Sequence, residues 1–214
     1  CSLFSRSRKE DPCDLAMPAD NSQNIGFYGG SFDPIHNGHL ELAKDLLEQA
    51  KLDRILFSPA NQAPLREHSY ACSPSDRFAM VSAAVADSPG LEAIDIEIKE
   101  GGTNFTLDTL RMLKRKMPNA IFSVIIGADQ LEKLPRWQRI EELVKETEFL
   151  VLARPGHQLS PPPELIDLRM RSFDTREFEV SSSEVRNRIR DHLPFQELVP
   201  TPVASIITQR KLYR

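Results

Sequence analysis

The sequence has few cysteines and no long hydrophobic run, and both absences narrow the class of protein. Its three cysteines, Cys1, Cys13 and Cys72, are an odd number and form no C-x-x-C pair. This pattern argues against a disulfide framework and against a structural zinc site. No apolar run approaches the ~18–20 residues that a membrane-spanning helix needs. We therefore expect a soluble, cytoplasmic protein with no membrane partner.

The sequence also lacks a sustained basic stripe. Its 27 Lys and Arg residues and 31 Asp and Glu residues give a net charge of −4, whereas proteins that bind nucleic-acid phosphates cluster their cations. We expect no nucleic-acid partner, and we expect anionic ligands to be held by local groups. A chain of 214 residues, 40% of them hydrophobic, can bury roughly 70% of its unfolded surface in one core.

The first 22 residues are polar, show no periodicity and differ in composition from the rest. We interpret residues 1–22 as a disordered leader and residues 23–214 as the folded domain. Met17 lies shortly before the first strand-like run, and we take it as a candidate natural start. Lipid attachment at Cys1 and a targeting peptide are the alternatives, but the acidic residues and the missing apolar segment argue against both.

From residue 24 onward, short apolar runs alternate with helical patterns. Alternating strands and helices with apolar strands predict a doubly wound α/β fold, with a parallel sheet covered on both faces. In such sheets ligands bind beyond the carboxyl ends of the strands, so the loops after the first, fourth and fifth strands are the expected site. The expected strands are 25–28, 54–58, 91–98, 120–126, 148–153 and 168–173, and the expected helices are 38–50, 75–86, 106–116, 137–146, 181–191 and 200–209.

The segment GFYGGSFDPIHNGHL, residues 26–40, carries the strongest chemical signal. Gly29 and Gly30 follow a strand directly, and there the backbone can approach a phosphate while the next helix presents its amino-terminal amides. His36 and His39 are three residues apart at the start of that helix, so both imidazoles can face one phosphate chain. Two surface histidines are the alternative. A zinc pair is disfavoured because no third ligand lies nearby.

A second anion-binding element is predicted at FEVSSSEVRNRIR, residues 178–190. Ser181, Ser182 and Ser183 supply a helix cap with several hydroxyl and amide donors, and Arg186 adds a guanidinium one turn later. An exposed capped helix is the alternative for this element taken alone.

These two segments resemble the H-x-G-H and I-S-S-T-x-I-R signatures of the nucleotidyltransferase superfamily. The resemblance implies that His36, His39 and Arg186 are catalytic and stabilise the phosphates of a nucleoside triphosphate during transfer. It implies that Asp33 shapes the loop and is not a base. The implied ATP-binding residues of these segments are Gly29, Gly30, Ser31, Phe32, Gly38, Ser181, Ser182 and Ser183.

Three further segments, EGGTNFTLDTL (100–110), IIGADQLEKLPRW (125–137) and VLARPG (151–156), are similar to those of bacterial nicotinate-nucleotide adenylyltransferases. The resemblance extends from about Ile25 to Arg214. It implies that Gly127, Asp129 and Arg154 bind ATP. It also implies a mononucleotide site in which Trp137 stacks on the pyridine ring and backbone amides near Thr106 and Gln138 hold the nicotinate carboxylate, with plain core packing as the alternative for Trp137.

Two departures from the family pattern affect the mononucleotide site. The family's P-P-H-K segment is represented by APLR, residues 63–66, in which Arg66 keeps a basic group and Leu65 replaces the histidine. The family's Ser-Tyr-Thr is represented by Asn104, Phe105 and Thr106. Arg66 is nevertheless assigned to mononucleotide binding.

The resemblance implies transfer of AMP from ATP to nicotinate mononucleotide, with Mg²⁺ held mainly by the substrate phosphates and no metal ligands supplied by the protein. Nicotinamide mononucleotide or phosphopantetheine as the acceptor, and a catalytically silent nucleotide-binding protein, are the alternatives. Assembly into a homo-oligomer stays open.

Overall fold

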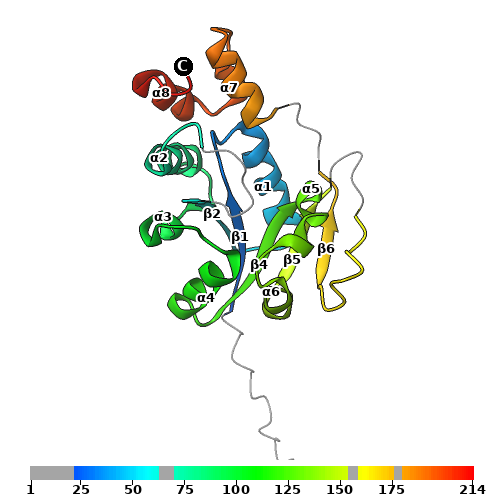
Figure 1. Cartoon of the computed structure of the whole chain (residues 1–214). Coiled ribbons are helices and arrows are strands. Elements are labelled where there is room, and N and C mark those ends of the chain that lie inside the picture. The colour runs from blue at the N-terminus through cyan, green and yellow to red at the C-terminus, as the bar shows by residue number, and fades with distance from the viewer. Residues whose placement is uncertain (1–21, 63–69, 154–158, 176–179) are drawn as a thin grey trace, which may run out of the picture.

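The computed structural model describes residues 22–62, 70–153, 159–175 and 180–214, which build a six-stranded parallel sheet with flanking helices (Figure 1). The strands are β1 (Gln23–Gly30), β2 (Arg54–Pro59), β3 (Leu91–Ala93), β4 (Ala120–Gly127), β5 (Glu148–Leu152) and β6 (Met170–Phe173). The helices are α1 (Asn37–Gln49), α2 (Pro74–Val85), α3 (Ile96–Glu100), α4 (Thr106–Lys116), α5 (Ala128–Leu131), α6 (Ile140–Glu146), α7 (Ser182–Arg190) and α8 (Thr201–Arg210), with short 3-10 helices η1 (Leu134–Arg136) and η2 (Gln196–Leu198).

The strand order is β3-β2-β1-β4-β5-β6, and every neighbouring pair is parallel. The chain fills the sheet outward from β1 in one direction and then outward from β4 in the other. The switch point therefore lies between β1 and β4, where a doubly wound sheet opens a crevice for a ligand. The predicted doubly wound α/β fold is confirmed.

Each face of the sheet carries its own hydrophobic core. Along β2, Ile55 and Phe57 belong to one core and Leu56 to the other, as expected for side chains that alternate across a strand. The first core takes its helical residues from α1, α2, α7 and α8. The second takes them mainly from α4, α5 and α6. Because both faces are covered, most of the buried residues of the central strands are apolar.

Most predicted elements are confirmed to within a few residues, but two predictions are wrong. The expected strand 91–98 ends as a strand at Ala93, and the chain then forms α3 over Ile96–Glu100. The expected helix 137–146 begins only at Ile140, because Trp137 has an extended backbone and Arg139 adopts a left-handed conformation with φ 58°. In both places a short irregular segment lies where the apolar pattern alone predicts a continuous strand or helix.

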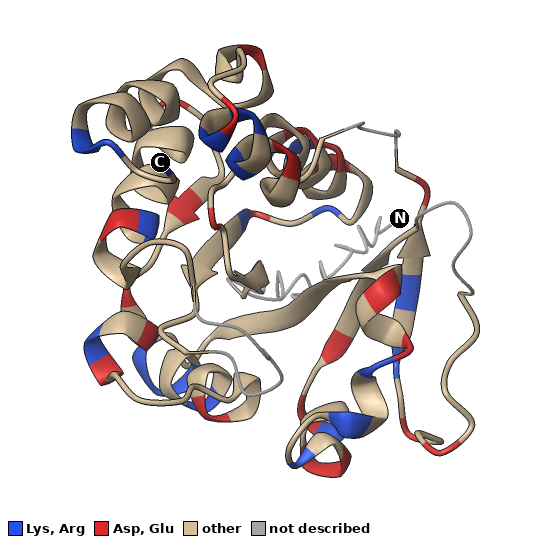
Figure 2. Cartoon of the chain, turned by 45° about the horizontal axis from the view of Figure 1, so that its top comes forward, with Lys and Arg blue, Asp and Glu red and all other residues tan. Residues whose placement is uncertain are grey.

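The predicted leader, residues 1–22, lies outside the described residues except for Ser22. The division into a leader and a domain from residue 23 therefore stays a prediction. None of the helices in the described part of the chain has the length and apolarity needed to cross a membrane. Acidic and basic residues are interspersed over these helices (Figure 2).

Candidate active site

A cavity of about 650 Å³ opens at the carboxyl ends of the central strands. Its walls come from the ends of β1 and β4 and from the starts of α4, α5 and α7. This is the switch point of the sheet, where ligands of doubly wound folds bind. Of the residues assigned to the site from the sequence, those that line the cavity are Gly29, Gly30, Ser31, Phe32, His39, Thr106, Gly127, Asp129, Trp137, Gln138 and Ser182.

The loop after β1 is tightly constrained. Phe32 is buried and has φ 45°, a left-handed backbone that a bulky residue seldom adopts. A Cβ on Gly30 would lie only 3.0 Å from the Phe32 ring. The close fit of this glycine against the ring fixes the path of the backbone where it passes the cavity.

The two histidines stack on each other at the start of α1. Their ring centroids are 3.7 Å apart, and the His36 backbone N–H donates to His39 Nδ1 at 3.2 Å. His39 lines the cavity, whereas His36 is the N-cap residue of α1, is 7% exposed and lies behind His39. Gly38 is buried where the first segment packs against the second. A Cβ at this position would lie only 3.0 Å from the Val180 side chain and 3.2 Å from the His36 ring.

The start of α7 packs directly on the loop that precedes α1. Ser182 Oγ donates to the Pro34 carbonyl at 2.8 Å, and Arg186 Nη1 donates to the Asp33 carbonyl at 2.7 Å. Arg186 also donates to Ser183 Oγ at 3.1 Å. Ser181 caps the helix by accepting from the Glu184 N–H. The two anion-binding segments predicted from the sequence, about 150 residues apart, are therefore in contact.

Asp33 holds this loop to the rest of the fold. It is 1% exposed, and its carboxylate accepts from the Ala71 N–H at 2.8 Å and from the Tyr213 hydroxyl at 3.0 Å. The Cys72 thiol, 3.3 Å from the same carboxylate, is its third donor. Burial raises the pKa of Cys72 to about 12 and also raises the pKa of Tyr213. The contacts of Asp33 are those of a group that shapes a loop.

Arg77 of α2 is a buried residue that sequence analysis missed. It is fully buried and donates to the Ser31 carbonyl at 2.7 Å and to the Ala60 carbonyl at 2.6 Å, which joins the loops after β1 and β2. Its guanidinium lies 3.8 Å from the centroid of the Tyr70 ring. Burial lowers the pKa of Arg77. An arginine in a helix whose other inward residues are apolar is the signal that could have identified it.

The side of the cavity assigned to the mononucleotide combines an aromatic face with a helix start. Trp137 is half-buried, lines the cavity and meets Phe149 of β5 edge-on with ring centroids 6.5 Å apart. Thr106 is the first residue of α4. Asn104 accepts from the Asn61 N–H at 3.1 Å, so the loop that departs from the family pattern is tied to the end of β2.

On the side of the cavity that is assigned to ATP, Asp129 is the one carboxylate among the described residues. Gly127 is the N-cap of α5, and Asp129 within α5 accepts from Gln130 Nε2 at 2.8 Å while lining the cavity. The described residues contain no group of three or more His, Cys, Asp or Glu side chains placed to hold a metal ion. Arg66 and Arg154, both assigned to the site from the sequence, lie outside the described residues.

Glu97 is the second buried residue that sequence analysis missed. It lines the cavity from α3, is 5% exposed, and accepts from Thr109 Oγ1 at 3.1 Å. Burial raises the pKa of Glu97 to about 7, and the Thr109 hydrogen bond and the charge of Arg77 only partly oppose this rise. The expected strand 91–98 gives no reason to place this carboxylate in the site, whereas α3 turns it toward the cavity.

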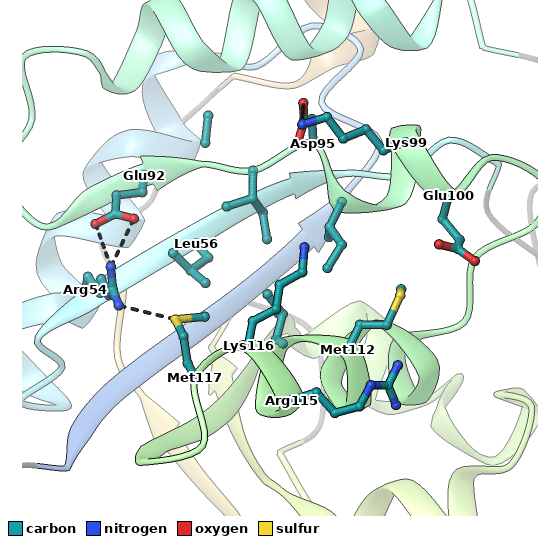
Figure 3. A pocket seen from close by; sticks show the side chains of 14 residues that line it. Arg54, Leu56, Glu92, Asp95, Lys99, Glu100, Met112, Arg115, Lys116 and Met117 are labelled. Atoms are coloured by element: carbon teal, nitrogen blue, oxygen red, sulfur yellow. Dashed lines mark hydrogen bonds and ion pairs between the residues drawn. The ribbon is translucent and has the colours of Figure 1, made fainter.

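A second cavity, of about 670 Å³, lies between the β2–β3 edge and α4 (Figure 3). Its lining includes the apolar Leu56 and Met112, and some of its charged residues pair with each other, Arg54 with Glu92 and Lys99 with Asp95. None of the residues assigned to the site from the sequence lines it.

Comparison with known proteins shows the family of the chain. A cytidylyltransferase-like family model matches residues 27–188. A probable nicotinate-nucleotide adenylyltransferase of Opitutus terrae is 40% identical over 190 residues, which cover 89% of this chain and 97% of the relative. The nicotinate-nucleotide adenylyltransferase of Bacillus subtilis is 35% identical, with coverage of 89% and 98%.

The chain belongs to the nicotinate-nucleotide adenylyltransferase family. Among solved structures, the nicotinic acid mononucleotide adenylyltransferase of Plasmodium falciparum, in complex with NaAD, has the same fold. Its TM-score is 0.74 at 20% identity, with coverage of 89% of this chain and 97% of that one. As a member of this family of transferases, the chain is a nucleotidyltransferase.

Proposed function

We propose that the protein transfers AMP from ATP to nicotinate mononucleotide and forms nicotinate adenine dinucleotide, also called deamido-NAD, and pyrophosphate. The contact between α7 and the loop before α1 carries this proposal, because Arg186 and Ser182 bring the second anion-binding segment onto the first. The relatives that share 35–40% identity along most of the chain carry the name of this activity.

The reaction needs positioning and charge stabilisation more than acid–base chemistry. A phosphate oxygen of the mononucleotide attacks the α-phosphorus of ATP, and the bond from that phosphorus to the oxygen bridging to the β-phosphorus breaks, so pyrophosphate leaves. The attacking phosphate is already ionised at neutral pH and requires no base. The enzyme's task is to hold both substrates in line and to stabilise the charge on the transferred group.

The residues around the cavity divide this task. His39, which lines the cavity, stabilises the α-phosphate together with His36, whose backbone N–H also holds the His39 ring. Arg186 and the amino-terminal end of α7 take the departing pyrophosphate, since a helix start and a guanidinium both favour an anion. Gly127 and Asp129 contact the nucleoside of ATP, and Arg66 and Arg154 complete the two substrate sites.

The pyridine ring of the mononucleotide stacks on Trp137, and backbone amides near Thr106 and Gln138 hold its carboxylate. Neutral amides at the start of α4 favour a carboxylate without a buried counter-charge. Trp137, Thr106 and Gln138 all line the cavity.

Mg²⁺ fits this site only as a partner of the substrate. Asp129 is a lone carboxylate on the nucleotide side of the described cavity, so the ion would be held mainly by the substrate phosphates and water, which is a common arrangement for Mg²⁺. When bound, the ion neutralises charge on the phosphates of ATP. The cytoplasm is the proposed location.

Pyrophosphate release distinguishes the candidate acceptors. The protein is incubated with ATP and Mg²⁺ and, in parallel, with nicotinate mononucleotide, nicotinamide mononucleotide or phosphopantetheine. We expect the first to be preferred. Preference for another acceptor contradicts the assigned pyridine site but leaves the phosphate site intact, whereas ATP binding without release with any acceptor contradicts the proposed transfer and supports a silent nucleotide-binding protein.

A further inference from the structure

Glu97 lines the same cavity as Thr106, whose backbone amide is assigned to the nicotinate carboxylate. Its side chain projects from α3 against the first turn of α4 and forms part of the cavity wall together with Thr106. The Thr109 hydroxyl, one turn after Thr106, donates to Glu97 Oε1 at 3.1 Å and contacts the Phe105 carbonyl at 3.4 Å. The glutamate is therefore attached to the same helix start whose amides are assigned to the substrate.

The described structure gives Glu97 no ion pair. On α2, the nearest cation, Arg77, directs its hydrogen bonds at backbone carbonyl groups of the two loops. On α4, the only partner is the neutral Thr109 hydroxyl, since Asp108 is exposed and pairs with Arg139. The ionised form of this carboxyl group therefore lacks a counter-charge in direct contact.

Other titratable groups line the same cavity from further elements. His39 comes from α1, Asp129 from α5, and Lys133 and Arg136 from the segment that contains η1. Of the cavity's acids, Glu97 is the one in the wall shared with Thr106. Since burial raises the pKa of Glu97 to about 7, its carboxyl group changes charge near neutral pH.

If the protein has the proposed function, this placement brings the carboxyl group of Glu97 close to the carboxylate of the bound nicotinate. The nicotinate carboxylate is ionised at neutral pH, so an ionised Glu97 in the same wall repels it, and a protonated Glu97 does not. The carboxamide of nicotinamide mononucleotide is neutral and is little affected by the charge on Glu97.

We propose that Glu97 is a specificity-determining residue, whose carboxyl group takes up one proton from solvent when the nicotinate carboxylate binds. The preference for the acid over the amide mononucleotide then falls as the pH rises. The inference deepens the proposed function and rests on it.

The test is the ratio of kcat/KM for nicotinate mononucleotide to kcat/KM for nicotinamide mononucleotide, measured across pH. Both acceptors carry the same phosphate, so the titration of substrate phosphates and of ATP cancels in the ratio. For an acid with a pKa of about 7, we expect the ratio to fall by at least about tenfold between about pH 6 and about pH 8.5.

The variant Glu97→Gln keeps the size of the side chain and removes its titration, so its ratio should stay constant with pH. Glu100→Gln, on the same helix but exposed, is the matched control and should follow the wild type. A wild-type ratio that is constant with pH, or a Glu97→Gln ratio that falls as steeply as the wild type's, overturns the inference. No pyrophosphate release with either acceptor refutes the proposed function instead.

A binding measurement supplies a readout that does not depend on turnover or on the variant. Calorimetric titration of the wild type near pH 7.5 in two buffers of different ionisation enthalpy gives the number of protons taken up. We expect nicotinate mononucleotide to take up more protons than nicotinamide mononucleotide, by a sizeable fraction of one. Equal uptake by the two ligands contradicts a role for Glu97.

Discussion

At the scale of single residues, Arg77 shows how a buried cation can organise a site without touching its ligands. Its guanidinium donates hydrogen bonds to the carbonyl groups of both Ser31 and Ala60. The loops after the neighbouring strands β1 and β2 are therefore held by the same side chain. A planar group with several donors suits this role, whereas a lysine can reach only part of the set.

Arg77→Lys should therefore lower the free energy of unfolding by about 2–4 kcal/mol, because buried carbonyl acceptors lose their donors. Urea unfolding measures this loss. Arg115→Lys, at an exposed position of α4, is the control and should change stability by less than about 0.5 kcal/mol. Equal stability of Arg77→Lys and wild type would show that the two loops hold their positions without the guanidinium.

The raised pKa of Glu97 also predicts how the free energy of unfolding depends on pH. Its pKa is raised from 4.5 to about 7 in the folded protein, so below 4.5 both folded and unfolded states are protonated and no difference arises. Between these values the unfolded chain ionises first, and the stability falls by about 3 kcal/mol as the pH rises, then levels off.

Glu97→Gln removes this titration, so its stability relative to the wild type should increase from about pH 5 to about pH 8. Chemical unfolding of both proteins across this range gives the difference, with Glu100→Gln as the reference. A difference that does not change with pH would mean that the folded protein leaves the pKa of Glu97 near its ordinary value.

At the scale of secondary-structure elements, the contact between α7 and the loop before α1 determines the geometry of the proposed phosphate site. Arg186 joins the Asp33 carbonyl to the Ser183 hydroxyl with two nitrogens of one planar group. Such a two-point contact fixes orientation more firmly than the point charge of an ammonium group.

Arg186→Lys should lower kcat by about 10- to 100-fold with little change in Tm, since it keeps the charge and loses the fixed geometry. The measurement is steady-state pyrophosphate release together with thermal unfolding. Arg190→Lys, one turn further along the exposed face of α7, should retain wild-type activity. A fully active Arg186→Lys enzyme would remove Arg186 from the assigned catalytic group.

The sequence patterns predicted these elements well where a helix or strand is long and uniformly apolar on one side. They failed at α3 and before α6, for two different physical reasons. The run LEAIDIEI alternates like a strand, but the last pairing of β3 is Ala93 with Phe57 of β2, and the five residues of α3 are too few for a clear helical period. The left-handed Arg139 carries no sequence signal of its own, since arginine is not a turn residue.

At the scale of the whole molecule, contacts between distant segments complete the site. The Tyr213 hydroxyl reaches Asp33 across 180 residues of sequence, and Arg210 Nη1 pairs with Asp76 at 2.6 Å. Sequence motifs predict two phosphate-binding segments, but they do not indicate the buried Arg77 and Glu97 or the partly buried Tyr213, which lie around the proposed site. Their roles depend on which segments the fold brings together, and a single sequence does not contain that information.

Tyr213→Phe removes one donor from the buried Asp33 carboxylate and should lower the free energy of unfolding by about 1–3 kcal/mol, as for other hydrogen bonds to charged groups. Arg214→Ala, at the exposed neighbouring position, should have little effect. Denaturant unfolding measures both. A Tyr213→Phe protein as stable as the wild type would mean that the remaining partners of Asp33, Ala71 and Cys72 among them, satisfy its carboxylate.

The central claim is that this cavity joins AMP to nicotinate mononucleotide, and product analysis tests it most directly. Purified protein is incubated with ATP, Mg²⁺ and nicotinate mononucleotide, and the dinucleotide is identified by mass spectrometry for the wild type, for His39→Ala and for the exposed control Glu48→Ala. We predict nicotinate adenine dinucleotide from the wild type and the control, and a yield at least about a hundredfold lower from His39→Ala. No dinucleotide from the wild type, or undiminished formation by His39→Ala, would contradict the account.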